Sequence, residues 1–268
     1  MANGWAVVTG ASSGIGLEFA RVLARRGYPV LAVARRRERL EALASQASVH
    51  GGRIEPLTAD LMTEQGVASV VRRIEELREI ELLINSAGIA NAGDFLGTSL
   101  DREIEAIMLN VGAVVRLTHA VLRRMVNTRH GAIINLASVV AFQPFPHFAV
   151  YAATKAFVLS FTEAVAEEVK GTGVQVLAVC PGAAKTEMEM FSHNAGLLGK
   201  LPSLTPGEVV KSALHALESG RVIKIVGRFN GLLVFMNRFL PRMVVRFMMG
   251  AVAKPPSVRH EVSVPNKN

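Results

Sequence analysis

Cysteine is nearly absent from this sequence, and tryptophan and tyrosine are scarce. Its one cysteine, Cys180, cannot form an internal disulfide, so nothing supports an oxidising compartment. Because Cys180 ends an apolar run, we expect it in the core. One Trp and two Tyr, with no dense block of Lys and Arg, argue against a nucleic-acid partner. No set of metal ligands is expected either.

The sequence shows no cleavable leader, because the chain already has the pattern of a strand from Ala6 onwards. A cytoplasmic protein is therefore expected. Residues 131–154 contain no Asp, Glu, Lys or Arg, and a run of about 20 apolar residues can cross a bilayer. Polar Asn135 and Gln143 and the prolines Pro144 and Pro146 argue against a span. This segment is predicted to be a buried strand, an irregular loop and the start of a helix.

What the chain does have is apolar surface and positive charge. Half of its 268 residues are hydrophobic, the mean hydropathy is +0.32 and the net charge is +8. One α/β domain can reach this size. The charge suits nucleic acid, an anionic membrane surface or an anionic cofactor, and does not by itself choose among them.

Apolar runs rich in Val, Ile and Leu alternate with longer amphipathic stretches, which predicts an α/β fold: a doubly wound, Rossmann-type parallel sheet of seven strands with helices on both faces. The expected strands are 5–9, 30–34, 54–57, 82–85, 132–137, 174–179 and 222–226. The expected helices are 16–26, 37–46, 64–77, 101–127, 150–170 and 206–218. We expect one catalytic domain over 1–228, an amphipathic extension over 229–253 and a loosely held tail over 254–268.

A glycine-rich turn follows the first expected strand. Gly10, Gly14 and Gly16 occupy places where side chains would obstruct a tight bend, a close approach to phosphate, or packing of the helix on the sheet. The helix that follows would offer free amides to a pyrophosphate. The turn predicts a dinucleotide site.

Tyr151 and Lys155 lie four residues apart on an expected helix, so a phenol and an ammonium share one face. Presenting a phenolate at pH 7 costs about 4 kcal/mol, and one unit charge at about 4 Å offsets a similar amount. The alternative is a solvated helix face. Ser138, thirteen residues earlier, and the glycine turn favour a proton-transfer pair. With the motifs Thr-Gly-x-x-x-Gly-x-Gly and Tyr-x-x-x-Lys in place, residues 4 to about 226 resemble the short-chain dehydrogenase/reductase family.

This resemblance implies roles for further residues. The catalytic set would be Asn110, Ser138, Tyr151 and Lys155, with Tyr151 as acid or base, Lys155 lowering the pKa of its phenol, Ser138 holding the carbonyl oxygen and Asn110 positioning a water relay. Cofactor contacts would come from Gly10, Ser12, Ser13, Gly14, Ile15, Gly16, Asp60, Leu61, Asn85, Ala87, Gly88, Tyr151, Lys155, Pro181, Gly182 and Thr186. Ser86 stands where the family has a second Asn. As structural alternatives, Asp60 caps a helix and Asn85 ties strand ends together.

The end of the second expected strand indicates which cofactor is preferred. A carboxylate there would favour NAD(H), but the chain has Ala34 followed by Arg35, Arg36 and Arg37. A guanidinium can clamp a 2′-phosphate, so NADP(H) is expected, with Arg35 as the contact nearest the strand. The alternative is a solvated helix start.

Substrate contacts are expected from the loops 139–150 and 187–204, which are mainly apolar. The predicted substrate residues are Ser138, Val140, His147, Tyr151 and Met188, and the substrate is expected to be a lipid-, steroid- or ketone-like carbonyl or alcohol. His147 could instead lie on the rim.

The extension has helical apolar spacing from Leu232 to Met248, with an arginine stripe at Arg238, Arg242 and Arg246 predicted opposite it. Pro241 is expected to start a second helix. The segment 232–251 could lie on an anionic membrane, or could be a lid or a subunit interface.

The leading hypothesis is an NADPH-dependent oxidoreductase. A non-catalytic dinucleotide sensor and a methyltransferase are the alternatives, and the Tyr151, Lys155 and Ser138 set argues against both. By resemblance, the helices beginning near Asp101 and Val150 would build a homodimer or homotetramer.

Overall fold

The computed structural model describes residues 4–187, 203–237 and 239–253. Its seven strands form one parallel sheet in the order β3-β2-β1-β4-β5-β6-β7. The strands are β1 Trp5–Thr9, β2 Val30–Ala34, β3 Ile54–Thr58, β4 Ile80–Asn85, β5 Gly131–Leu136, β6 Val174–Pro181 and β7 Ile223–Val226. Every expected strand is confirmed, with ends within two residues. The doubly wound α/β fold is therefore confirmed as well.

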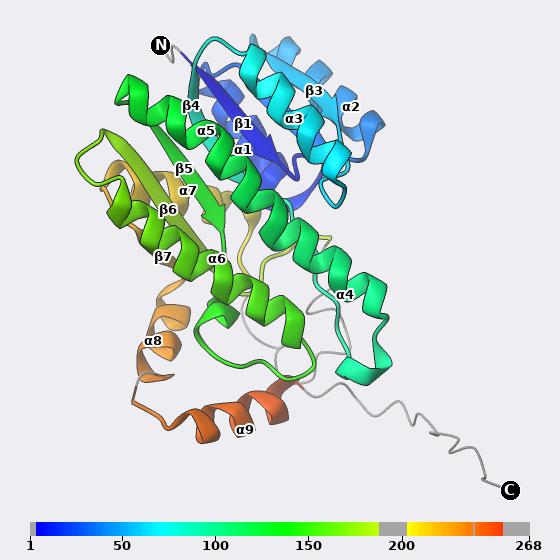
Figure 1. Ribbon diagram of the computed structural model, residues 1–268, viewed down its shortest axis with the longest axis vertical. Helices are drawn as coiled ribbons and strands as arrows, with labels where there is room; N and C mark the ends of the chain where they lie inside the picture. The colour runs from blue at the N-terminus through cyan, green and yellow to red at the C-terminus, as the bar shows by residue number, and fades with distance from the viewer. Residues whose placement is uncertain (1–3, 188–202, 238, 254–268) are drawn as a thin grey trace, which may run out of the picture.

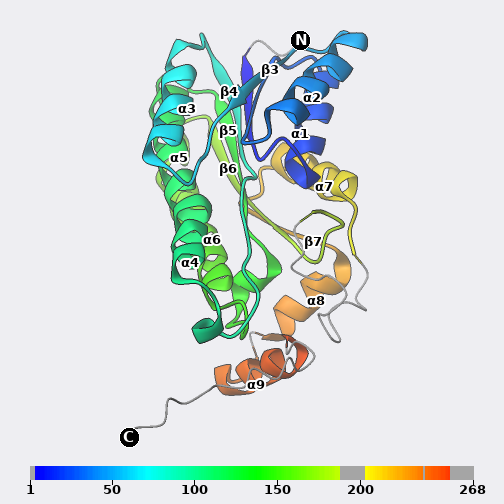
Figure 2. The same ribbon diagram turned by 90° about the vertical axis from the view of Figure 1, so that its right-hand side faces the viewer.

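Helices cover both faces of this sheet (Figures 1 and 2). Helices α1, α2 and α7 pack on one face, and α3, α5 and α6 on the other. The described helices are α1 Gly14–Arg25, α2 Arg37–Val49, α3 Glu64–Glu76, α4 Leu100–Ile107, α5 Val114–Thr128, α6 Ala149–Glu168, α7 Pro206–Glu218, α8 Arg228–Asn237 and α9 Arg242–Ala253. Three shorter turns are η1 Phe95–Gly97, the π-helix η2 Met108–Ala113 and η3 Val139–Phe142.

Alternation along the strands divides the core into two layers. In β1, Ala6 and Val8 belong to the layer under α1 and α7, whereas Val7 points to the layer under α3 and α5. Cys180 is fully buried, as expected. Because both faces are covered, the inner strands β1 and β2 are buried along nearly their whole length, whereas the edge strand β3 is buried only at its first residue and alternates between half-buried and exposed residues after it.

Local signals set several helix ends. Thr205 and Glu208 form a reciprocal capping box at the start of α7, with Pro206 in the first turn.

The helix expected over 101–127 is not a uniform α-helix, because the π-helical turn η2 lies between α4 and α5. Such bulges are difficult to foresee from side-chain periodicity, since they insert one residue without changing the apolar face much.

Two described helical segments, Leu100–Thr128 and Ala149–Glu168, are long and apolar enough to cross a bilayer. Both pack against the sheet and contribute to its core, so length and composition carry little weight here. The uncharged stretch 131–154 forms β5, η3 and the start of α6, as predicted.

The extension forms two helices, α8 and α9, beyond the carboxyl ends of the strands (Figure 2). Pro241 precedes the second helix, as predicted, and its carbonyl accepts from Val244 and Val245. The predicted apolar face is not buried by the rest of the chain, which contradicts a lid closed through that face. Helix α9 instead buries Val245 and Ala253. Arg238 and the tail 254–268 lie outside the described residues.

Candidate active site

A cleft of about 570 Å³ opens at the carboxyl ends of the strands, where the strand order reverses between β1 and β4. Open parallel sheets bind ligands at such a switch point. The predicted site residues that line it are Gly10, Ser12, Ser13, Gly14, Ile15, Gly16, Arg35, Asp60, Leu61, Ala87, Gly88, Ser138, Tyr151, Lys155, Pro181, Gly182 and Thr186. Asn85, Asn110, Val140 and His147 do not line it, and Met188 lies outside the described residues.

The glycine turn lies so close to its surroundings that side chains would not fit. Gly10 has a φ of 69°, and a Cβ there would lie 2.9 Å from the Cα of Ala87. A Cβ on Gly16 would overlap the carbonyl of Gly10. The hydroxyl of Thr9 accepts from the amides of Ser86 and Ala87, both at 3.0 Å. The turns after β1 and β4 are thus held together as one backbone surface.

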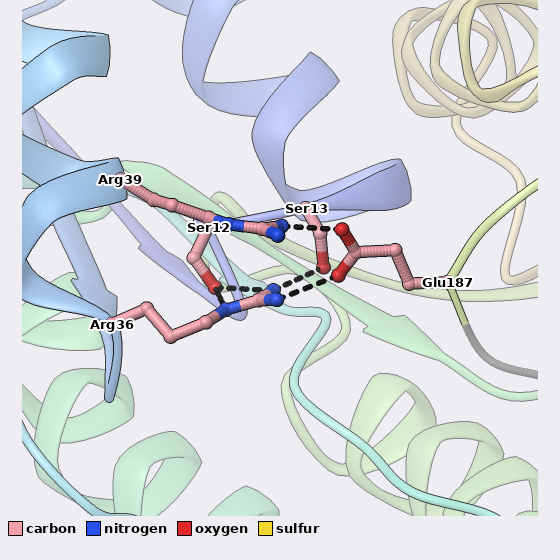
Figure 3. A network of polar contacts seen from close by, with 5 residues as sticks. All are labelled: Ser12, Ser13, Arg36, Arg39 and Glu187. Atoms are coloured by element: carbon pink, nitrogen blue, oxygen red, sulfur yellow. Dashed lines mark hydrogen bonds and ion pairs between the residues drawn. The ribbon is translucent and has the colours of Figure 1, made fainter.

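Arginines reach this turn from the start of α2 (Figure 3). Arg36 donates to the hydroxyl of Ser12 at 3.0 Å and to that of Ser13 at 2.8 Å. It also pairs with Glu187 at 2.7 Å, and Arg39 binds the other oxygen of the same carboxylate. These two guanidiniums lower the pKa of Glu187 to about 2. Two guanidiniums therefore hold one carboxylate, and one of them, Arg36, is also bound to both serine hydroxyls of the turn.

Arg35, the arginine predicted to be the cofactor contact, also lines the cleft, and its Nη1 lies 3.8 Å from the sulfur of Met62. Arg35 stays the predicted cofactor contact, and Arg36, which the sequence did not single out, is the arginine bonded to the glycine turn. The glycine turn and the arginines after β2 come together only in the folded chain. The position of Arg35 next to β2 in the sequence therefore could not show whether Arg35 or Arg36 contacts the turn.

Asp60 and Leu61 follow β3 at the side of the cleft. Asp60 accepts from the amide of Met62 at 3.1 Å, and Leu61 is buried. Asp60 is not the side-chain cap of α3, because Thr63 caps that helix by accepting from Gly66.

Asn85 has the structural role that was the alternative to cofactor binding. Its Nδ2 donates to Asn135 at 2.8 Å and lies 3.3 Å from the hydroxyl of Thr118. Asn135 in turn donates to Thr162 at 3.0 Å. This buried ladder ties β4 and β5 to the helices below them, so the Asn85 side chain points away from the cleft.

Ser138, Tyr151 and Lys155 meet in the buried part of the cleft. Ser138 lies two residues after β5, at the start of η3, and shares a side-chain hydrogen bond with Tyr151, which lies in the first turn of α6. The Nζ of Lys155 lies 5.7 Å from the Tyr151 ring centroid and donates to the carbonyl of Leu136 at 2.6 Å. All three are at least 95 % buried.

Burial dominates the acidity of this pair. It raises the pKa of Tyr151 to about 12, and the hydrogen bond from Ser138 only partly opposes it. Burial also lowers the pKa of Lys155 to about 8. Burial and Ser138 account for the shift in the pKa of the phenol, and the lowering of that pKa by Lys155 stays a prediction. At pH 7 the pair is a neutral phenol beside an ammonium, which is the form that donates a proton.

Asn110 lies in the π-helix η2, close to Lys155. Its amide oxygen accepts from the backbone of Ile89 at 3.0 Å, and its Nδ2 donates to the hydroxyl of Thr154 at 3.0 Å. A Cβ on Gly88 would lie 3.1 Å from Asn110 and 3.5 Å from the Nζ of Lys155. Asn110 is thus next to the lysine but bound to main chain and Thr154. The π-bulge turns it inward, and such bulges are frequent at functional sites.

Pro181 ends β6, and Gly182 and Thr186 follow it along the other wall of the cleft. A Cβ on Gly14 would lie 3.0 Å from the methyl of Thr186, so the glycine turn and this wall are in contact. Gly182 lies against Asn230 of α8, which donates to Val226 at 2.7 Å. The extension therefore reaches the cofactor side of the cleft.

The substrate side is apolar. Val140, Phe145, Phe148 and Tyr151 form one buried cluster, and Met249, Val252 and Ala253 of α9 complete it. The pattern of the sequence did not indicate that α9 packs here. His147 has a φ of 62°, and its Nδ1 lies 2.8 Å from Asp94, near enough for an ion pair although the hydrogen-bond angle is poor. His147 belongs to the rim.

These residues fit a nicotinamide dinucleotide. A Cβ at Gly10 or Gly16 would block the close approach of a phosphate to the backbone of the turn. Ser12, Ser13 and Arg36 place hydrogen-bond donors beside the first turn of α1. The amides at that helix start suit a pyrophosphate. When bound, the dinucleotide supplies a hydride.

Comparisons with known proteins agree with this geometry. A family model described as short chain dehydrogenase matches residues 4–196. A short chain dehydrogenase from Pseudocercospora fijiensis is 38% identical over 186 residues, which cover 68% of this chain and 60% of that protein, so the match spans less than two thirds of the relative. The 17-beta-hydroxysteroid dehydrogenase type 3 of Mus musculus is 31% identical, over 81% of this chain and 70% of its own.

Solved structures are similar as well. A short-chain dehydrogenase from Sphingobium yanoikuyae in complex with NADPH has a TM-score of 0.77 at 36% identity, over 83% of this chain and 87% of its own. A bulky-bulky ketone specific alcohol dehydrogenase from Comamonas testosteroni also has a TM-score of 0.77, at 33% identity, over 89% and 94%. The chain belongs to the short-chain dehydrogenase/reductase family of oxidoreductases, which act on alcohol and carbonyl groups.

Proposed function

We propose that this protein is a cytoplasmic NADP(H)-dependent oxidoreductase that interconverts a carbonyl and a secondary alcohol on a bulky apolar substrate. The observation that carries the proposal is the buried Ser138, Tyr151 and Lys155 set, which lies between the dinucleotide turn and an apolar cluster.

The residues have distinct tasks in reduction. Ser138 donates a hydrogen bond to the carbonyl oxygen and stabilises the charge that grows there. Tyr151 transfers its proton to that oxygen while the carbon accepts the hydride, and the same tyrosine takes the proton back in oxidation. Lys155 keeps a positive charge beside Tyr151 and so favours the phenolate that this transfer leaves behind.

The preference for NADP(H) is supported by Arg35 and Arg36. Arg36 and Arg39 already hold a carboxylate beside Ser12 and Ser13, so the place suits an anion. A 2′-phosphate is such an anion, whereas the free hydroxyl of NAD(H) carries no charge for the arginines to pair with. A similar chain has been solved with NADPH, which is consistent with this preference.

The apolar character of the substrate is supported by Phe145, Phe148 and Val140 around Tyr151. Relatives named for a hydroxysteroid and for bulky ketones point in the same direction. Exposed Leu100, Ile104 and Phe157 on α4 and α6 support a homo-oligomer that uses those helices.

The test is NADPH oxidation, followed by absorbance, with a panel of ketones that increase in bulk. Tyr151→Phe is expected to lower turnover by about 10²- to 10⁴-fold and to leave the NADPH dissociation constant within about twofold. Activity that survives this change would reject the mechanism. Tight NADPH binding with no turnover of any ketone or alcohol would favour the dinucleotide sensor instead.

A further inference from the structure

Helices α8 and α9 carry most of the exposed apolar surface of the described chain. Eleven of its nineteen exposed large hydrophobic side chains fall within residues 229–248. The most exposed are Phe239, Met243 and Phe247, at 73 %, 69 % and 80 %. The rings of Phe235 and Phe239 pack edge to face with centroids 5.1 Å apart. We call these four side chains and their apolar neighbours the extension face. Single exposed apolar residues are ordinary, but a continuous patch usually marks a binding surface.

The fold does not need the extension face for its own packing. Val245, Met249, Val252 and Ala253 recur at helical spacing on α9, and the last three join the apolar cluster of Tyr151. Met243 and Phe247 lie on the opposite side of the same helix. Helix α9 is therefore apolar towards the cleft and also apolar towards the outside, so an outside partner must be apolar as well.

The charges around the extension face are all of one sign. Residues 228–253 contain four arginines and no acidic residue, and therefore account for +4 of the net charge of +8. Arg228, Arg242 and Arg246 are exposed, and none forms an ion pair with a described residue. The charge around the exposed apolar residues of α4 is different, because acidic Asp101 and Glu105 lie beside Arg102 there. That mixed charge suits a second copy of the chain, whereas apolar side chains flanked only by arginines suit anionic headgroups over acyl chains.

We propose that α8 and α9 lie on the surface of an anionic lipid bilayer, with Phe235, Phe239, Met243 and Phe247 among the acyl chains and the arginines at the headgroups. Docking does not depend on the proposed reaction. If that reaction holds, the inner side of α9 brings the apolar cluster of Tyr151 to the bilayer, so that a lipid-dissolved substrate has a short path to it.

Co-sedimentation of the full chain with vesicles tests the proposal. We expect the wild type to pellet with vesicles containing phosphatidylglycerol, to pellet less with pure phosphatidylcholine, and to be released by high salt. Phe247→Asp should weaken partitioning by at least about tenfold, and the double variant Arg242→Glu with Arg246→Glu should weaken it only on anionic vesicles. Leu96→Asp, which changes an exposed leucine on η1, is the matched control and should pellet like the wild type.

All changed side chains are exposed, so thermal unfolding should stay within a few degrees of the wild type. The proposal is overturned if the wild type stays in the supernatant with every vesicle, or if Leu96→Asp loses as much binding as Phe247→Asp. Sedimentation velocity without lipid gives the remaining outcome. A dimer that Phe247→Asp dissociates would make the extension face an interface between copies and would also reject the membrane. None of these readouts requires catalytic activity.

Discussion

The two halves of the cleft are built in different ways. The cofactor half consists of backbone turns in contact, where Gly10 approaches Ala87 and Thr9 bonds the amides after β4. The half in which we propose that substrate binds is the apolar cluster that residues 140–152 form with α9, far away in the sequence, and Tyr151 is its buried member that lines the cleft. The first half tolerates no added atom, whereas the second can repack. We therefore expect backbone geometry to determine cofactor binding and side-chain volume to determine which substrates bind.

The largest difference between the halves should appear at Gly10. Gly10→Ala places a methyl 2.9 Å from the backbone of Ala87 at a positive φ, so the two turns must separate. We expect the NADPH dissociation constant, measured by fluorescence titration, to rise about 10- to 100-fold, with a loss of stability of about 2–4 kcal/mol.

Gly27→Ala is the matched control for this change. Gly27 also has a positive φ, but no atom lies within 4 Å of its Cβ position. It should therefore lose about 1–2 kcal/mol of stability through backbone strain alone and bind NADPH normally. Equal effects of the two variants on NADPH affinity would show that strain, and not the contact with Ala87, matters.

The cofactor half was predictable because its signals are local. Strand runs, the glycine spacing and Tyr151 with Lys155 all follow from positions a few residues apart. What the sequence did not indicate depends on tertiary contact. Asn85 faces a buried amide ladder, and Arg36 joins Ser12 and Ser13 only after β1 and β2 pair. The packing of α9 against the cluster of Tyr151 likewise has no signal in its own periodicity.

The pH dependence of the reaction tests the buried pair of Tyr151 and Lys155, which lies between the two halves of the cleft. Because burial lowers the pKa of Lys155 to about 8 and raises that of Tyr151 to about 12, the phenol keeps its proton across the neutral range while the ammonium loses its charge above pH 8. Ketone reduction at saturating NADPH should be flat from pH 6 to 7.5 and should then fall by up to about tenfold per unit. Rates that rise through pH 9 would contradict a role for the charged lysine.

A milder change in the substrate half should act on substrate alone. Phe145→Leu removes ring volume from the cluster around Tyr151, so the KM for a bulky ketone should rise several-fold while NADPH affinity stays the same. Stability should fall by about 1 kcal/mol. Phe161→Leu, in a ring stacked on Phe157 away from the cleft, should cost similar stability without changing KM. An equal KM effect in both variants would mean that general loosening is responsible.

The smallest expected effect concerns Glu187, which follows β6 and holds Arg36 and Arg39 beside the glycine turn. A bound 2′-phosphate and this carboxylate would compete for the same guanidiniums. Glu187→Gln removes the competing charge, so NADP⁺ should bind more tightly, whereas NAD⁺ should change little. The residues are about half exposed, and pairs of this kind contribute no more than about 1 kcal/mol, which limits the gain to about fivefold. Glu41→Gln, which breaks the exposed pair with Arg37, is the control and should leave both constants unchanged. If Glu187→Gln weakens the binding of NADP⁺ instead, the carboxylate serves to position the arginines for the phosphate, and the cofactor half depends on a side chain supplied by the segment after β6.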